Sequence, residues 1–194
     1  SVTVTGAVGG SAGLTGLNVT TDVLAANAIN FANNGILDIT ITGDSVINGV
    51  ISGTGISFDK SGVGTLTLNG NNTYGGITNI NAGTLKLGHA NALGSTAAGS
   101  GSVVNANSTL DLNGLSITEP VTLNGGRFIN GTLAGSMNLT ADSILEASSG
   151  ETEVEGIISG NFGLTITGNG TLTLSGNNTY TGLTNISSGT LRIT

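Results

Sequence analysis

Short runs in which apolar and polar residues alternate recur along the whole chain. They include Leu37–Ile41, Leu66–Leu68, Leu85–Leu87, Leu110–Leu112, Val121–Leu123, Met137–Leu139 and Leu164–Ile166. Strict alternation is typical of a strand that buries one of its faces. The runs are only three to five residues long, and Gly-Asn, Asn-Gly and Ser-Gly pairs, which favour turns, separate them. The pattern therefore predicts an all-β protein with no substantial helix.

One segment of the chain is duplicated. Residues 65–74 return as residues 171–180 with nine of the ten positions identical. The match continues from residues 77–87 to residues 183–193. Further upstream, Gly49–Gly53 corresponds to Gly156–Gly160 if one residue has been deleted between the copies. A recurring unit of this kind indicates a repeat architecture.

Within each copy the strand pattern returns after about 19 residues, the length of one solenoid coil. The pair Leu66–Leu68 is followed by Leu85–Leu87, and in the second copy Leu172–Leu174 is followed by Leu191–Ile193. An antiparallel sandwich or barrel needs no such period, whereas a parallel β-helix stacks equivalent strands of successive coils about 4.8 Å apart. We therefore predict a parallel β-helix, or β-solenoid, of about 9–10 coils with roughly 19–22 residues each, in which these pairs stack on one another.

The same pattern gives an expected organisation of the chain. Residues 1–194 are expected to form a single continuous β-solenoid. Within it, the two repeat copies are expected at about residues 47–88 and 154–194. Residues 89–153 would then form spacer coils between the copies.

Composition agrees with a folded chain and excludes several classes of function. Apolar residues make up 37% and charged residues 8%, and 34 glycines accompany one proline, which argues against both disorder and collagen. The net charge is −7, and the four basic residues, Lys60, Lys86, Arg127 and Arg192, are scattered, so nucleic acid and anionic membrane surfaces are not expected partners. No apolar run approaches the roughly 20 residues of a spanning helix, so no membrane insertion is expected. Without cysteine, no disulfide can form.

The most distinctive short motif is Gly-Asn-Asn-Thr-Tyr, at Gly70–Tyr74 and again at Gly176–Tyr180. One interpretation makes Asn71, Asn72 and Tyr74 a loop that contacts a ligand. Turn chemistry explains the motif better, because Asn and Gly accept positive φ and stacked Asn side chains form hydrogen-bonded ladders. On that interpretation the tyrosine ring packs over the turn and its hydroxyl lies in water.

Five of the eleven carboxylates lie close together, at Asp142, Glu146, Glu151, Glu153 and Glu155. Alternation in the run 151–155 places the three glutamates on one face of a strand and the residues between them on the other. Such a group could bind Ca²⁺, but the tight Asp/Asn and Gly spacing of a calcium loop is absent. A solvated face that opposes aggregation explains the run better.

No constellation of residues suggests catalysis. A β-helical lyase or hydrolase needs paired carboxylates or a calcium cluster facing a base, and Arg127 has no acidic partner nearby in sequence. The single histidine, His89, is expected to be an exposed turn residue, and the serines and threonines lack a histidine partner. We therefore predict no enzymatic activity, no catalytic residue, no cofactor and no metal site.

The segment Gly64–Gly88 closely resembles the passenger-associated transport repeat of autotransporters, also called the autotransporter-associated β-strand repeat, and Gly170–Ile193 resembles it equally well. Between them, Ala90–Gly94, Thr109–Gly114 and Ile117–Val121 resemble the spacer of such passengers. The resemblance implies a right-handed parallel β-helical passenger of a Gram-negative bacterium. It further implies type V secretion and a location outside the cell, at the outer surface of the outer membrane.

The leading hypothesis is a structural stalk segment of an adhesin-like autotransporter passenger that supports vectorial secretion and folding. An alternative is self-association through the solenoid ends or faces, because Ser1–Thr5 and Thr190–Thr194 both have strand patterns and no evident cap. A weaker alternative is a β-helix that binds or acts on carbohydrate. No particular host-surface or glycan ligand follows from the sequence.

Overall fold

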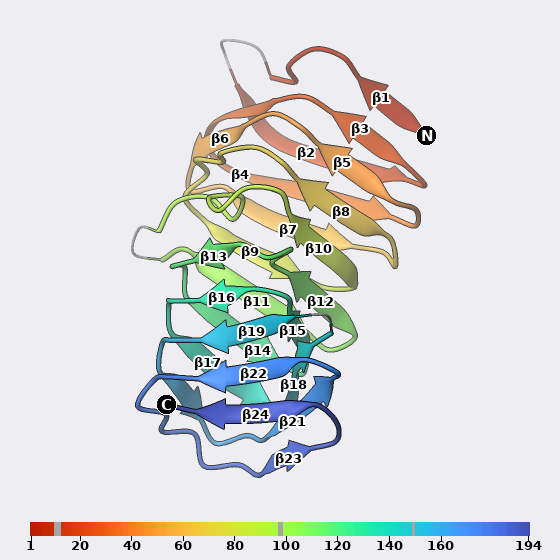
Figure 1. Ribbon diagram of the computed structural model, residues 1–194. Coiled ribbons are helices and arrows are strands. Elements are labelled where there is room, and N and C mark those ends of the chain that lie inside the picture. The colour runs from red at the N-terminus through yellow and green to blue at the C-terminus, as the bar shows by residue number, and fades with distance from the viewer. Residues whose placement is uncertain (10–12, 97–98, 149) are drawn as a thin grey trace.

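The computed structural model describes residues 1–9, 13–96, 99–148 and 150–194. Within these residues every regular element is a β-strand, and the strands stack into a solenoid of about nine turns (Figure 1). The all-β parallel solenoid predicted from the alternation is therefore confirmed. The described part of the chain contains no helix that is long and apolar enough to cross a membrane.

The strands form three sheets that run along the stack. The first sheet has ten strands: β1 (Val2–Val4), β3 (Leu24–Ala26), β5 (Ser45–Ile47), β8 (Thr65–Leu68), β10 (Gly83–Leu87), β12 (Ser108–Asp111), β15 (Arg127–Ile129), β18 (Ser143–Ala147), β21 (Leu164–Gly168) and β23 (Thr184–Ile186). The second has nine: β2 (Leu14–Thr21), β4 (Ile29–Ile41), β7 (Ser57–Ser61), β9 (Ile77–Ile80), β11 (Gly101–Asn105), β14 (Val121–Asn124), β17 (Met137–Ala141), β20 (Ile158–Gly160) and, beside β4, β6 (Ile51–Thr54). The third has five: β13 (Ser116–Ile117), β16 (Thr132–Leu133), β19 (Glu151–Val154), β22 (Thr171–Leu174) and β24 (Thr190–Ile193).

From β11 to β22 each coil visits the three sheets in turn. From β17 in the second sheet the chain passes to β18 in the first, β19 in the third and β20 in the second again. In the middle of the stack the third side is formed by segments without regular strands instead, at residues 69–76 and 88–96. The coil is therefore three-sided, and its corners hold the turn residues that punctuate the sequence (Figure 1).

The predicted register is present in both copies. Leu66 pairs with Leu85 and Leu68 with Leu87 in parallel strands, and the pairs of the second copy stack in the same way. Outside the copies the coil length varies more widely, from about 16 residues where Val121 pairs with Met137 to about 25 where Leu85 pairs with Leu110. Because strand pairing fixes the sides, the corners take up the difference. One strand, β4, has 13 residues, well beyond the expected three to five.

The core is a continuous column of inward-facing aliphatic and phenylalanine side chains. Along the first sheet each residue pairs with the next in register, and the series reads Leu66, Leu85, Leu110, Phe128, Leu145 and Ile166. All six are at most 1% exposed. Burial of one such side chain contributes about 1.5–3 kcal/mol, so stacking of each coil on the last is the main stabilising interaction.

The two repeat copies occupy different sides of the solenoid. In the first copy β7 lies in the second sheet and β8 in the first, whereas the corresponding strands β21 and β22 lie in the first and third sheets. Five steps along the first sheet lead from β8 to β21, and β22 is one side further on. The repeat distance therefore spans five coils and one additional side, so the same sequence faces two directions.

Candidate functional site: the repeat loop and the polar spacer

The loop of the first copy is anchored by a buried asparagine. Asn72 is 3% exposed, its Oδ1 accepts a hydrogen bond from the Ile51 amide (2.8 Å), and its Nδ2 donates to the Ala92 carbonyl (2.6 Å). Ile51 belongs to the preceding coil and Ala92 to the following one, so one side chain joins three coils. In the second copy Asn178 Oδ1 accepts from the Ile158 amide (2.9 Å), which repeats half of this arrangement.

Tyr74 is fully buried, contrary to the expectation that its hydroxyl lies in water. The hydroxyl is hydrogen-bonded to Thr78 Oγ1 (2.7 Å), and the ring meets Phe58 edge to face at 6.2 Å between centroids. Burial raises the pKa of the Tyr74 hydroxyl. The reason is the following coil, which closes over the ring: a Cβ on Gly94 would lie 3.0 Å from it, so only glycine fits there at its φ of 89°.

Stacked asparagines continue on the outside of the solenoid, as the turn interpretation predicts. Their amide groups donate to the side-chain oxygens of asparagines one coil away, in the pairs Asn69–Asn48, Asn91–Asn71, Asn105–Asn81 and Asn124–Asn105. Asn72 and Tyr74 face inward. Of the three residues that the alternative interpretation expects to contact a ligand, only Asn71 lies on the surface. The loop side chains therefore serve mainly to join coils.

Lys60 lies inside the solenoid with no exposed surface. Its ammonium donates to the carbonyls of Gly62 (2.7 Å), Gly64 (2.7 Å), Ala82 (2.9 Å) and, more weakly, Ser61 (3.3 Å). Burial lowers the pKa of Lys60 from its ordinary value of 10.5 to about 8. The alternation pattern contained a signal for this burial, because Lys60 lies two residues after the buried Phe58 and therefore on the same face of the strand. The corresponding residue of the second copy is the apolar Ile166.

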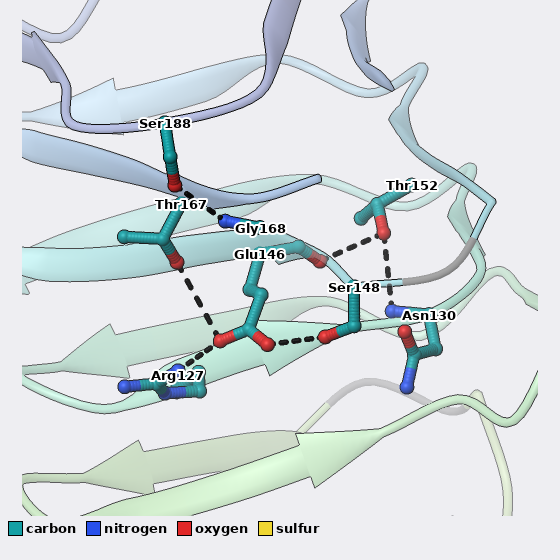
Figure 2. Close-up of polar contacts among 8 residues, drawn as sticks. All are labelled: Arg127, Asn130, Glu146, Ser148, Thr152, Thr167, Gly168 and Ser188. Carbon is teal, nitrogen blue, oxygen red and sulfur yellow. Dashed lines mark hydrogen bonds and ion pairs between the residues drawn. The ribbon is translucent and has the colours of Figure 1, made fainter. Parts of the chain in front are cut away.

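Arg127 does have an acidic partner, which comes from the next coil. Its guanidinium forms an ion pair with Glu146, directly hydrogen-bonded, across the neighbouring strands β15 and β18 (Figure 2). Proximity in the sequence does not reveal this pair, because stacking brings together residues about one coil apart. The hydroxyls of Ser148 and Thr167 also donate to Glu146, and the Ser148 bond together with the Arg127 charge lowers the pKa of that carboxyl.

The remaining acidic run forms the expected two-faced strand. Thr152 and Val154 are buried, while Glu151, Glu153 and Glu155 face outward. Glu151 pairs with Arg192 (2.7 Å), and Glu153 accepts from Ser175 Oγ (2.8 Å). Thr152 Oγ1 donates inward to the Glu146 carbonyl (2.9 Å) and accepts from the Asn130 amide (3.1 Å; Figure 2). Across the described residues, no three metal-binding side chains gather into a possible metal site.

Two further titratable residues lie at corners. His89 is in a turn, as expected, but is half-buried, and its Nδ1 accepts from the Asn91 amide (3.0 Å). Glu119 is 2% exposed, its Oε2 has no hydrogen-bond partner, and burial raises its pKa. Nothing in the sequence marked Glu119, because it stands in a turn segment without alternation.

A family model described as Passenger-associated-transport-repeat matches residues 58–87 and 164–193. The resemblance of the duplicated segment to this repeat is thereby confirmed, and the chain carries two copies of it. The matched segments include Lys60, Asn72 and Tyr74 in the first copy and Asn178 and Tyr180 in the second. No curated protein matches the chain.

Proposed function

We propose that the chain is a stalk segment of an adhesin-like autotransporter passenger, exported by type V secretion and displayed on the surface of a Gram-negative bacterium. The two passenger-associated transport repeats support this proposal. The observation that carries it is the use of the repeat's own polar side chains: Asn72 and Tyr74 make contacts between coils and leave little for a ligand.

The same contacts favour vectorial folding during export. The Thr73 amide donates to the Ile51 carbonyl of the preceding coil, and the Ser95 amide donates to the Tyr74 carbonyl from the following one. Each coil thus satisfies its hydrogen bonds on its immediate neighbours, and folding can proceed one coil at a time from a folded edge.

A non-enzymatic role fits the charged residues. Arg127 and Glu146 neutralise each other, His89 holds its own turn, and Lys60 is enclosed by carbonyl groups. General acid-base catalysis requires such groups to face a substrate together. Here each is engaged in holding a corner or a pair of strands.

Export with folding can be tested by surface display in a Gram-negative host. The chain is placed between a signal peptide and a translocator barrel, and protease-resistant surface protein is measured. We expect the wild-type chain to appear as a resistant fragment and Asn72→Ala to reduce its amount severalfold, because two bonds between coils are lost. Asn71→Ala, in the same loop, loses only the exposed bond from Asn91, so it is the matched control and should display almost as well as the wild type. A wild-type chain that is displayed but degraded, or equal display of both variants, would contradict the proposal.

A further inference from the structure

Two hollows lie side by side on the outer face of the first sheet. One, of about 540 Å³, is lined by Thr84, Thr109, Arg127 and Glu146, and the other, of about 430 Å³, by residues that include Lys86 and Asp111. Thr84 and Lys86 are alternate outward residues of β10, and Thr109 and Asp111 are alternate outward residues of β12. The hollows therefore form one band across the width of the same strands, which we call the spacer band.

The spacer band crosses coils of unequal length, because Thr84 pairs with Thr109 after about 25 residues. Thr109 pairs with Arg127 after about 18 residues, and Arg127 pairs with Ile144 after about 17, so both coils are shorter than those of the repeat copies. At their corner stand Gly125 and Gly126, which line the first hollow with bare backbone. A Cβ on Gly126 would lie 2.5 Å from Cγ1 of the buried Val104, so only glycine lets the backbone pass this close to the core.

Two of the four basic side chains line this band. Lys60 is buried, Lys86 and Arg127 line the hollows, and Arg192 pairs with Glu151, which lines the second one. Within the described parts of the chain, the Lys86 ammonium has no hydrogen-bonded or ion-paired partner. Two of the four basic residues thus line the band, a third pairs with a residue that lines it, and Lys86 is left available.

The acidic groups of the band are held in fixed positions. Asp111 Oδ1 accepts from the Asn113 amide (2.9 Å) and from Asn130 Nδ2 (3.2 Å). Glu146 is held by Arg127 and Ser148 (Figure 2). The band therefore presents immobilised hydrogen-bond acceptors next to cationic donors. Because these acceptor side chains are already ordered, binding of a ligand does not carry the entropic cost of ordering them.

We infer that the spacer band binds an uncharged oligosaccharide. Each sugar hydroxyl both donates and accepts, which matches alternating carboxylate acceptors and ammonium, guanidinium and amide donors. An apolar ligand would find only Ile129 and Ile144 among polar walls. Lys86, Arg127 and the Arg192 that pairs with Glu151 balance the charges of Asp111, Glu146 and Glu151, so the band has no net charge to attract a metal ion or a polyanion. This inference is independent of the export proposal.

The inference can be tested by NMR on the whole 194-residue chain. Short linear oligosaccharides of glucose, galactose, mannose and N-acetylglucosamine are titrated while backbone amide shifts are followed. We expect at least one series to move the amides of β10 and β12 with a dissociation constant below about 1 mM. Lys86→Ala should weaken that binding about fivefold or more and leave stability unchanged, because Lys86 has no internal partner to lose.

A matched pair of bulky variants separates the spacer band from the rest of the surface. Thr109→Trp fills the first hollow and should abolish the shifts, whereas Thr122→Trp, at an outward position of β14 in the second sheet, should not. The inference is overturned if no oligosaccharide moves these amides up to about 10 mM. It is equally overturned if both Lys86→Ala and Thr109→Trp bind like the wild type, or if only Ca²⁺ produces the shifts.

Discussion

Replacing Lys60 with methionine should destabilise the first repeat copy. The substitution keeps a long unbranched side chain in the core but removes the ammonium that the carbonyls of Gly62, Gly64 and Ala82 surround. Gly64 retains a weak bond from the Thr84 amide (3.3 Å), whereas the other two carbonyls lose their donor. Because Ala82 lies on the next coil, the substitution also removes a bond between coils.

The magnitude follows from two opposing terms. A hydrogen bond to a charged group is worth about 1.5–3 kcal/mol, so the three close bonds contribute about 6 kcal/mol. Burial of the charge, which lowers the pKa of Lys60 from 10.5 to about 8, costs about 3 kcal/mol. Methionine removes both terms, and the expected loss is about 3 kcal/mol. For a chain of this size that corresponds to a fall in Tm of about 6–12 °C.

The pH dependence of stability gives a second signature. The unfolded chain binds the Lys60 proton more tightly than the folded one, because the folded pKa is the lower of the two. Wild-type stability should therefore rise as pH increases from about 8 to about 10.5, whereas Lys60→Met lacks this contribution. The difference in stability between the two proteins should thus grow with pH across that window.

The assay is urea unfolding followed by far-UV circular dichroism at several pH values. Lys86→Met serves as the control, since it removes an outward lysine without an internal partner and should cost less than about 0.5 kcal/mol. Hydrogen exchange at the Thr84 amide locates the effect in the first copy. The reasoning is refuted if Lys60→Met loses less than about 1 kcal/mol, or if Lys86→Met loses as much.

Three further substitutions test other contacts. Tyr74→Phe should cost about 1 kcal/mol by urea unfolding and Tyr180→Phe less than half of that, because only the Tyr74 hydroxyl is fully buried; equal losses would contradict the burial argument. For Glu119, whose pKa is raised by burial, the stabilising contribution is present at low pH and lost as pH rises through the folded pKa. The Tm of Glu119→Gln should therefore gain on the wild type as pH rises above 4.5, the ordinary pKa of the carboxyl, and parallel profiles would show that the carboxyl does not titrate in the fold. Asn72→Ala should cost about 2–3 kcal/mol and accelerate exchange of the Ile51 amide, and unchanged exchange there would argue against the clamp.

Much of the fold followed from residue parity and spacing. Alternation located the strands, and the regular recurrence within each copy gave the register of Leu66 on Leu85, because stacked parallel strands repeat once per coil. If the alternation of inward and outward residues is applied without exception, it also places Lys60 inside the solenoid beside Phe58. The residue type argued against this position, because lysine is almost never fully buried unless its charge is satisfied.

The candidate sites were harder to predict, because their partners come from neighbouring coils of variable length. Arg127 and Glu146 lie one coil apart in the sequence and meet only through the pairing of β15 with β18. The ring of Tyr74 was expected to pack over its turn with the hydroxyl in water, yet the following coil covers the hydroxyl as well. Turn composition describes how a chain bends and carries no information on what packs over the bend.

The sequence by itself determined that the chain is a parallel β-solenoid containing two copies of one repeat. This part of the fold can be predicted from the sequence because alternation and recurrence depend only on a coil and its nearest neighbour. The tertiary structure decided which side of the solenoid each copy occupies. The same strands lie in the second and first sheets in one copy and in the first and third sheets in the other. The intervening coils differ in length, from the short step between Val121 and Met137 to the long one between Leu85 and Leu110. The packing at each corner sets the length of its coil. The lengths of the intervening coils therefore sum to the one additional side that separates the two copies.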